Sequence, residues 1–269
     1  MDIAEWLARR GGIAHRRELA LAGFTAAELR DPALQRIGRS WLALESAPPD
    51  LVEAATVGGR VTCVTAARRL GLALLRDPAE RHVWVPGNAR AGRRAGRRLH
   101  RSSPLSPVGP TALVAAVADV LSHVAECLPE MEAQIVWDSA LRKGLLPPAV
   151  LHRIPWPGPR QRRLAKLATA DSDSLLETVA AFHLRRERIP FRQQVVLLGR
   201  PVDFLVDERL VLQVDGYEFH RDARQRRSDI EFDARLLAAG RPVIRRDYAG
   251  VVHDPAALIR DLRAALLAR

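Results

Sequence analysis

The chain has 269 residues, with 42 lysines and arginines against 31 aspartates and glutamates, so its formal net charge is +11. This length allows two compact domains or three small ones, and a hydrophobic content of 48% excludes an intrinsically disordered chain. The two cysteines, Cys63 and Cys127, are too few for a disulfide framework or a Cys-rich zinc site and form no CxxC pair. We therefore expect a protein of the reducing cytoplasm.

The first 48 residues predict a small module of three helices followed by a β-hairpin. Helices are expected over 3–9, over 15–22 and over 25–31, where Thr25 and Glu28 form a capping box. Residues 34–37 and 41–44 flank a short turn and are typical of paired strands. This order is that of a winged helix-turn-helix, whose third helix and hairpin contact DNA. The expected DNA contacts are Arg30, Arg36 and Arg39, and the alternative is a module that packs or binds a protein partner.

The middle region, 49–153, is expected to be α+β, with a helical pattern over 51–75 that Gly58 and Gly59 interrupt, a second helical pattern over 111–143 and a strand over 82–87. No motif in it points to chemistry. Arginines crowd one of its segments, which indicates either phosphate binding or a solvated basic face. The candidate DNA contacts there are Arg93, Arg94, Arg97 and Arg98, flanked by Arg90 and Arg101. A bias toward arginine is also typical of GC-rich coding sequences, so clustering carries more weight than net charge.

The order of the segments VTAARRLGL, HVWVP, RLHRS, VADVL and WDSALRKGLL resembles the AbiEi-type antitoxins of type IV toxin–antitoxin systems over roughly residues 1–150. That resemblance implies an N-terminal winged helix that binds promoter DNA and a toxin as a possible partner. A stretch rich in proline and arginine then predicts a linker over 154–169, which includes Arg160, Arg162, Arg163 and Lys166. No membrane partner is expected, because the most apolar stretch, 112–121, is far shorter than the ~20 residues of a membrane span.

The last region, 170–269, contains the most informative pattern. A helix is expected over 174–185 with Glu177 in its first turn, a strand over 193–198, and a hairpin that pairs 202–206 with 210–214. Because side chains alternate along a strand, Asp203 is expected to share a face with Gln213 and Asp215. Carboxylates in an apolar sheet need a cation, and oxygen ligands favour Mg²⁺ or Mn²⁺, so Asp203 and Asp215 are the predicted metal ligands.

The motifs SLLE, VDF and LQVDGYEFH, followed by LLAAGRPVIRRDY, resemble the PD-(D/E)xK nuclease superfamily and its very-short-patch-repair-endonuclease-like members. The resemblance implies a restriction-endonuclease-like α/β core, and hence an α/β fold overall. It implies that Asp203 is the principal metal ligand, that Glu177 supports the metal or its water, and that Asp215 occupies the place of the motif lysine. His220 would assist proton transfer.

Two departures from that pattern leave the function open. Gln213 stands where the family has an acid, and no lysine follows Lys166. The first reading is a Mg²⁺- or Mn²⁺-dependent DNA endonuclease that works with a repair or restriction partner. The second is a non-catalytic DNA-binding regulator or antitoxin that retains a degenerate nuclease fold. A third hypothesis is an RNA-directed nuclease, which composition does not separate from a DNA-directed one.

Overall fold

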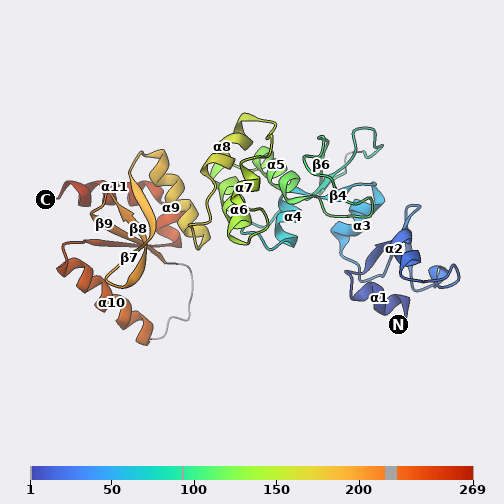
Figure 1. Ribbon diagram of the computed structural model, residues 1–269, viewed down its shortest axis with the longest axis horizontal. Helices are drawn as coiled ribbons and strands as arrows, with labels where there is room; N and C mark the ends of the chain where they lie inside the picture. Colours follow the sequence, from blue (N-terminus) through green and yellow to red (C-terminus); the bar gives the residue numbers. More distant parts are fainter. Residues whose placement is uncertain (1, 93, 216–222, 269) are drawn as a thin grey trace. The chain divides into compact units, whose positions relative to one another are not determined.

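The computed structural model describes residues 2–92, 94–215 and 223–268 of the chain. These residues form a mixed α/β fold with three small sheets, and the chain divides into two compact units (Figure 1). The N-terminal unit comprises residues 1–129 and 146–166, and the C-terminal unit comprises 130–145 and 167–269. In the described part of the chain, no helix combines the length and apolar character needed to cross a membrane.

The first 48 residues form a three-stranded antiparallel sheet of order β1-β3-β2 beside two short helices. Their elements are α1 (Ile3–Ala8), β1 (Ile13–His15), α2 (Arg16–Leu21), η1 (Glu28–Arg30), β2 (Gln35–Ile37) and β3 (Trp41–Ala43). The first two predicted helices and the hairpin are present. The predicted third helix is wrong, because η1 is a single 3₁₀ turn. Thr25 and Glu28 do cap each other, but Pro32 follows too soon for an α-helix to propagate.

The rest of the N-terminal unit surrounds the sheet β4-β5-β6, in which β4 and β5 are antiparallel and β5 and β6 parallel. A short strand that follows Gly58 and Gly59 interrupts the helical pattern expected over 51–75. The φ of Gly58 is +65°, and a Cβ at Gly59 would collide with the Trp84 carbonyl, so both positions favour glycine. The elements are α3 (Pro49–Thr56), β4 (Arg60–Val61), α4 (Cys63–Arg69), β5 (Arg81–Trp84), β6 (Arg97–His100), α5 (Val117–Cys127), α7 (Pro148–Leu151) and α8 (Pro159–Leu167).

The expected linker, 154–169, is a packed segment in the structure. Trp156 is buried and donates from its indole Nε1 to the Leu151 carbonyl at 3.0 Å. Helix α8 buries Gln161 and Leu164. Arg162 of this helix also stabilises the segment, because it donates hydrogen bonds to the carbonyls of Trp156 and Pro157. Proline here therefore begins a helix instead of marking an extended connection.

The C-terminal unit is a four-stranded sheet of order β10-β9-β8-β7, with β9 and β10 parallel and the other pairs antiparallel. Helix α10 packs on one face through Phe232 and Leu236, while α9 and α11 lie on the other face (Figure 1). The elements are α6 (Glu130–Arg142), α9 (Leu175–Arg186), β7 (Phe191–Leu197), β8 (Arg200–Val206), β9 (Leu210–Asp215), α10 (Ala223–Ala238), β10 (Val243–Asp247), the π-helical turn η2 (Ala249–His253) and α11 (Pro255–Leu267).

Candidate functional site

The acidic residues of the nuclease-like pattern lie on two central strands and one helix of the C-terminal unit. Asp203 is in the middle of β8, Gln213 and Asp215 are in the second half of β9, and Glu177 is in the first turn of α9, which Ser174 caps. The backbone N–H of Asp203 donates to Gln213 Oε1 at 3.2 Å, and Asp203 Oδ2 accepts from the Val214 N–H at 2.8 Å. The structure therefore brings Asp203 and Gln213 into direct contact.

Strand pairing is interrupted at Asp203. Strands β7 and β8 pair at Gln193–Phe204 and at Val195–Val202, but the position of Asp203 between these pairs is unpaired. The pairing of β8 with β9 ends at Phe204–Leu212, next to Asp203. Where these backbone pairs are missing, Asp203 is joined to β9 by its two hydrogen bonds with the Gln213 side chain and the Val214 N–H. Val202 and Leu205 pack in one apolar cluster although they are three residues apart, so the alternation of side chains shifts between them. The sheet is thus opened locally at its central acid.

Glu177 is held by a residue opposite this interruption. Its Oε2 accepts from Gln194 Nε2 at 2.8 Å and from the Asp173 N–H at 2.9 Å. Gln194 has a φ of +52°, in the left-handed region that costs a non-glycine residue about 1–2 kcal/mol. The strained backbone therefore coincides with a hydrogen bond to a buried carboxylate.

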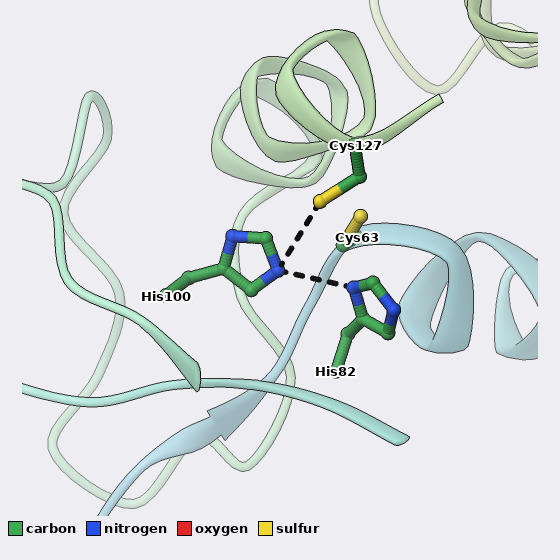
Figure 2. A group of neighbouring side chains, drawn as sticks. All are labelled: Cys63, His82, His100 and Cys127. Carbon is green, nitrogen blue, oxygen red and sulfur yellow. Dashed lines mark hydrogen bonds between the residues drawn. The ribbon is translucent and has the colours of Figure 1, made fainter. Parts of the chain in front are cut away.

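The pKa of Asp203 is raised to about 6, chiefly by burial and also by the nearby carboxylates of Glu177 and Asp215, while the hydrogen bond from Val214 opposes this rise. Glu177 and Asp215 thus lie near enough to act electrostatically on Asp203. They do not form a closed ligand set, because in the described part of the chain only the group shown in Figure 2 brings three or more metal-ligand atoms within 4.8 Å of one another.

A cationic side chain that the sequence analysis missed lies beside these acids. Arg245 on β10 is the register partner of Gln213 on β9. Its Nε and Nη2 donate to Asp233 at 2.6 and 2.9 Å, and its Nη1 lies 3.4 Å from both Asp215 carboxylate oxygens. The bonds to Asp233 raise the pKa of Arg245, so it remains charged. Residue order alone gave no sign of this contact, because it depends on the parallel pairing of β10 with β9.

One predicted catalytic residue, His220, lies outside the described residues. Asp229 and Asp233, which the nuclease-like pattern leaves unassigned, each face an arginine. Asp229 pairs with Arg200 at 3.2 Å, and Asp233 pairs with Arg245. Both carboxylates are therefore engaged in ion pairs within the unit.

The arginines predicted to contact DNA differ in whether they are exposed or already bonded within the protein. Arg30, Arg36 and Arg39 are exposed around η1 and the β2–β3 hairpin, and Arg94 and Arg98 are also exposed. Arg97 is committed internally, with its side chain 8% exposed and Nη1 3.4 Å from Glu53. Arg101 donates to carbonyls of the segment 86–91. Arg93 lies outside the described residues.

The N-terminal unit contains a buried group that the sequence analysis also missed. Figure 2 shows Cys63, His82, His100 and Cys127 pointing toward one another, with their ligand atoms all within 4.8 Å. His82 Nδ1 lies 3.1 Å from His100 Nε2, and Cys127 Sγ lies 3.8 Å from the same nitrogen. We refer to these four residues as the Cys/His cluster. Their separations of 19, 18 and 27 residues match no metal-binding spacing, so only the fold reveals them.

The electrostatics of the Cys/His cluster follow from its burial. Burial raises the pKa of the Cys63 thiol, whereas hydrogen bonds from Cys63, His100 and His82 lower that of Cys127. His123 stacks on His100 with ring centroids 4.4 Å apart, but its two nitrogens bond the hydroxyls of Thr62 and Ser102 at 2.7 Å. Burial lowers the pKa of His123 to about 3, so it is a neutral neighbour of the cluster.

Comparisons with known proteins do not assign the chain to a family. No protein-family model matches it, and no curated protein matches it. Among solved structures, the crystal structure of RV2827C protein from Mycobacterium tuberculosis is similar over 62% of this chain and 80% of that chain, with 17% identity and a TM-score of 0.23. A TM-score this low does not establish a shared fold.

Proposed function

We propose that the chain is a DNA-binding protein whose C-terminal unit hydrolyses phosphodiester bonds with a bound Mg²⁺ or Mn²⁺. The observation that carries the proposal is the contact of Asp203 with Gln213 where strand pairing is interrupted, together with the electrostatic effect of Glu177 and Asp215 on Asp203. An acidic group at an opened sheet position is costly to the fold, and that cost is expected where a cation and substrate bind. The helix, the hairpin and the parallel strand β10 support a restriction-endonuclease-like core.

The donor atoms suit a hard divalent cation, which prefers carboxylate and carbonyl oxygens. Asp203 and Asp215 would hold the ion, and Glu177 would support it or a water bound to it. Asp203 Oδ2 and Glu177 Oε2 are used in hydrogen bonds, so Oδ1 and Oε1 are the atoms left for coordination among the described contacts. The bound cation would polarise the phosphate and lower the pKa of its water.

Arg245 acts in this proposal as a positioning residue. Its guanidinium is shared between Asp233 and Asp215, so it holds Asp215 at the edge of the acidic group. It also supplies the positive charge that reduces repulsion among the acids when no cation is bound. Because its donors are engaged by Asp233, it does not replace the absent motif lysine as a free contact to the phosphate.

The N-terminal unit would supply affinity for the DNA backbone. Arg30 is exposed on η1, Arg36 and Arg39 are exposed on the β2–β3 hairpin, and Arg94 and Arg98 add two exposed charges. Exposed arginines bind phosphate without competition from internal partners, whereas Arg97 is paired with Glu53. The short η1 turn presents less surface than a recognition helix, so we propose backbone contacts with little reading of base sequence.

The test is nicking of supercoiled plasmid by the purified full chain. We expect weak nicking that is stronger with Mn²⁺ than with Mg²⁺ and that stops with a chelator. Gln213→Glu should increase it, because an anionic ligand holds the cation more tightly than an amide carbonyl. Asp203→Asn should abolish it while DNA binding in a gel-shift assay is retained.

The matched control is Asp207→Asn, which neutralises an exposed carboxylate in the turn between β8 and β9 and should leave nicking unchanged. The proposal is overturned if neither the native protein nor Gln213→Glu nicks DNA with any divalent cation while both bind DNA tightly. That result would favour a non-catalytic regulator. Nicking that persists in Asp203→Asn would place the chemistry elsewhere or in a contaminant.

A further inference from the structure

We infer that the N-terminal unit binds one structural Zn²⁺ ion through Cys63, His82, His100 and Cys127. The four side chains come from four elements, namely the first turn of α4, strand β5, the end of β6 and the end of α5 (Figure 2). This site is separate from the acidic residues of the proposed nuclease, which belong to the other unit.

The geometry of the Cys/His cluster is close to that of a tetrahedral zinc site. With Zn–N of about 2.05 Å and Zn–S of about 2.3 Å, two ligand nitrogens lie about 3.3 Å apart and a nitrogen and a sulfur about 3.5 Å apart. The corresponding separations are 3.1 Å between His82 Nδ1 and His100 Nε2, and 3.8 Å between His100 Nε2 and Cys127 Sγ. Small shifts of side chains would therefore complete the tetrahedron.

Hydrogen bonding among the four side chains accounts less well for this arrangement. An imidazole nitrogen has either one N–H or one lone pair directed in the ring plane, so it makes one good hydrogen bond. His100 Nε2 nevertheless faces both His82 Nδ1 and Cys127 Sγ. A cation at the common centre would use the lone pair of each ligand once.

The backbone at Cys63 is strained in a way that brings its thiol into the cluster. Its φ is +52°, a conformation that costs a residue with a Cβ about 1–2 kcal/mol, and the residue is fully buried. Thr62 precedes it, and the Thr62 hydroxyl bonds His123, which stacks on the ligand His100. The surrounding residues thus fix the orientation of both ligands.

The ligand types and their burial identify the ion and its role. Two thiolates and two imidazoles in a tetrahedron favour Zn²⁺ and exclude Mg²⁺ and Ca²⁺, which take oxygen ligands. Three of the four residues are buried, and four protein ligands leave no open position, which is typical of a structural site. His82 and His100 also flank the segment 85–96, so the ion would fix both ends of the loop that carries Arg90 and Arg94.

The test uses the full chain, without an affinity tag, purified without chelators. Elemental analysis should find about one zinc ion per chain. Cys127→Ser and His82→Ala should each lower the zinc content at least about tenfold. Replacement of Zn²⁺ by Co²⁺ should give thiolate-to-cobalt charge transfer and the visible bands of tetrahedral Co²⁺.

Three further variants keep the test decisive even if ligand deletions fail to fold. His82→Cys preserves a four-ligand set, so it should retain metal and show a stronger thiolate band with Co²⁺. His152→Gln alters an exposed histidine of the same unit, and Asp203→Asn alters the acidic site; both should keep the zinc content of the native chain. The proposal is overturned if the native chain contains no zinc and binds no Co²⁺ under reducing conditions, or if zinc is lost with Asp203 and not with Cys127.

Discussion

A buried carboxylate in the C-terminal unit makes a quantitative prediction about stability. Asp138 on α6 is fully buried, and its carboxylate accepts from Gln134 Nε2 at 2.6 Å, from the Thr169 N–H at 3.1 Å and from Thr178 Oγ1 at 3.1 Å. Burial outweighs these hydrogen bonds and raises the pKa of Asp138 to about 6, from an ordinary value near 3.8. The folded protein therefore holds a proton on Asp138 that the unfolded chain loses more readily.

The sign of the pH dependence follows from this proton. Between about pH 4 and pH 6 the folded state binds more protons at Asp138 than the unfolded state, so the free energy of unfolding falls as pH rises through that window. A shift of two pKa units corresponds to about 3 kcal/mol, which is the most that ionised Asp138 costs above pH 6. Asp138→Asn keeps the shape and the acceptor oxygen but cannot ionise. The variant should match the native protein near pH 4 and be more stable by up to about 3 kcal/mol near pH 8.

The measurement is urea unfolding of both proteins across this pH range, with the C-terminal unit followed by pulsed hydrogen exchange in peptides from α6 and α9. Asp173→Asn, an exposed carboxylate of the same unit, serves as the control and should show no such pH-dependent gain. A stability difference that does not change with pH would refute the reasoning. So would an Asn variant that becomes less stable as pH rises, because Asp138 would then be a stabilised anion.

Two further predictions concern the proposed function. Gln194→Gly removes the hydrogen bond to Glu177, but it also relieves the strain of the left-handed backbone at this position. The unfolding free energy should therefore change by less than about 1 kcal/mol, while plasmid nicking should fall. Unchanged nicking would show that the contact has no role in positioning Glu177. Arg30→Ala, Arg36→Ala and Arg39→Ala should each reduce the log–log salt slope of DNA binding by about 0.9, measured by fluorescence anisotropy, and a slope unaffected by all three would assign these arginines to another partner.

Local patterns predicted the parts of the fold that depend on neighbouring residues. The hairpin of β8 and β9 was predictable because two runs rich in strand-forming residues flank a polar triplet, and Asp207 and Glu208 indeed take the positive φ of a tight turn. The helix expected over 174–185 is likewise present as α9, with Glu177 in its first turn. The third N-terminal helix was wrong because a capping signal reports where a helix begins and not how far it extends.

The parts that depended on distant residues could not be predicted in the same way. Arg245 reaches Asp215 only because β10 pairs in parallel with β9, 30 residues earlier in the chain. The interruption at Asp203 involves β7 and β9 together, and no pattern within β8 marks it. Cys63 and Cys127 were too far apart for a motif, and each became a candidate ligand only when β5 and β6 placed two histidines between them.

The two proposed metal sites differ in ways that allow one chain to hold two ions without exchange between them. The acidic site offers oxygen atoms, and its central acid is only partly buried, which suits a cation that binds weakly and must meet a phosphate. The Cys/His cluster offers nitrogen and sulfur atoms from four elements and is almost entirely buried, so its ion is held by the fold itself. A chelator that stops nicking therefore does not by itself identify the catalytic ion. The catalytic ion is the one whose return restores nicking while the zinc content stays constant.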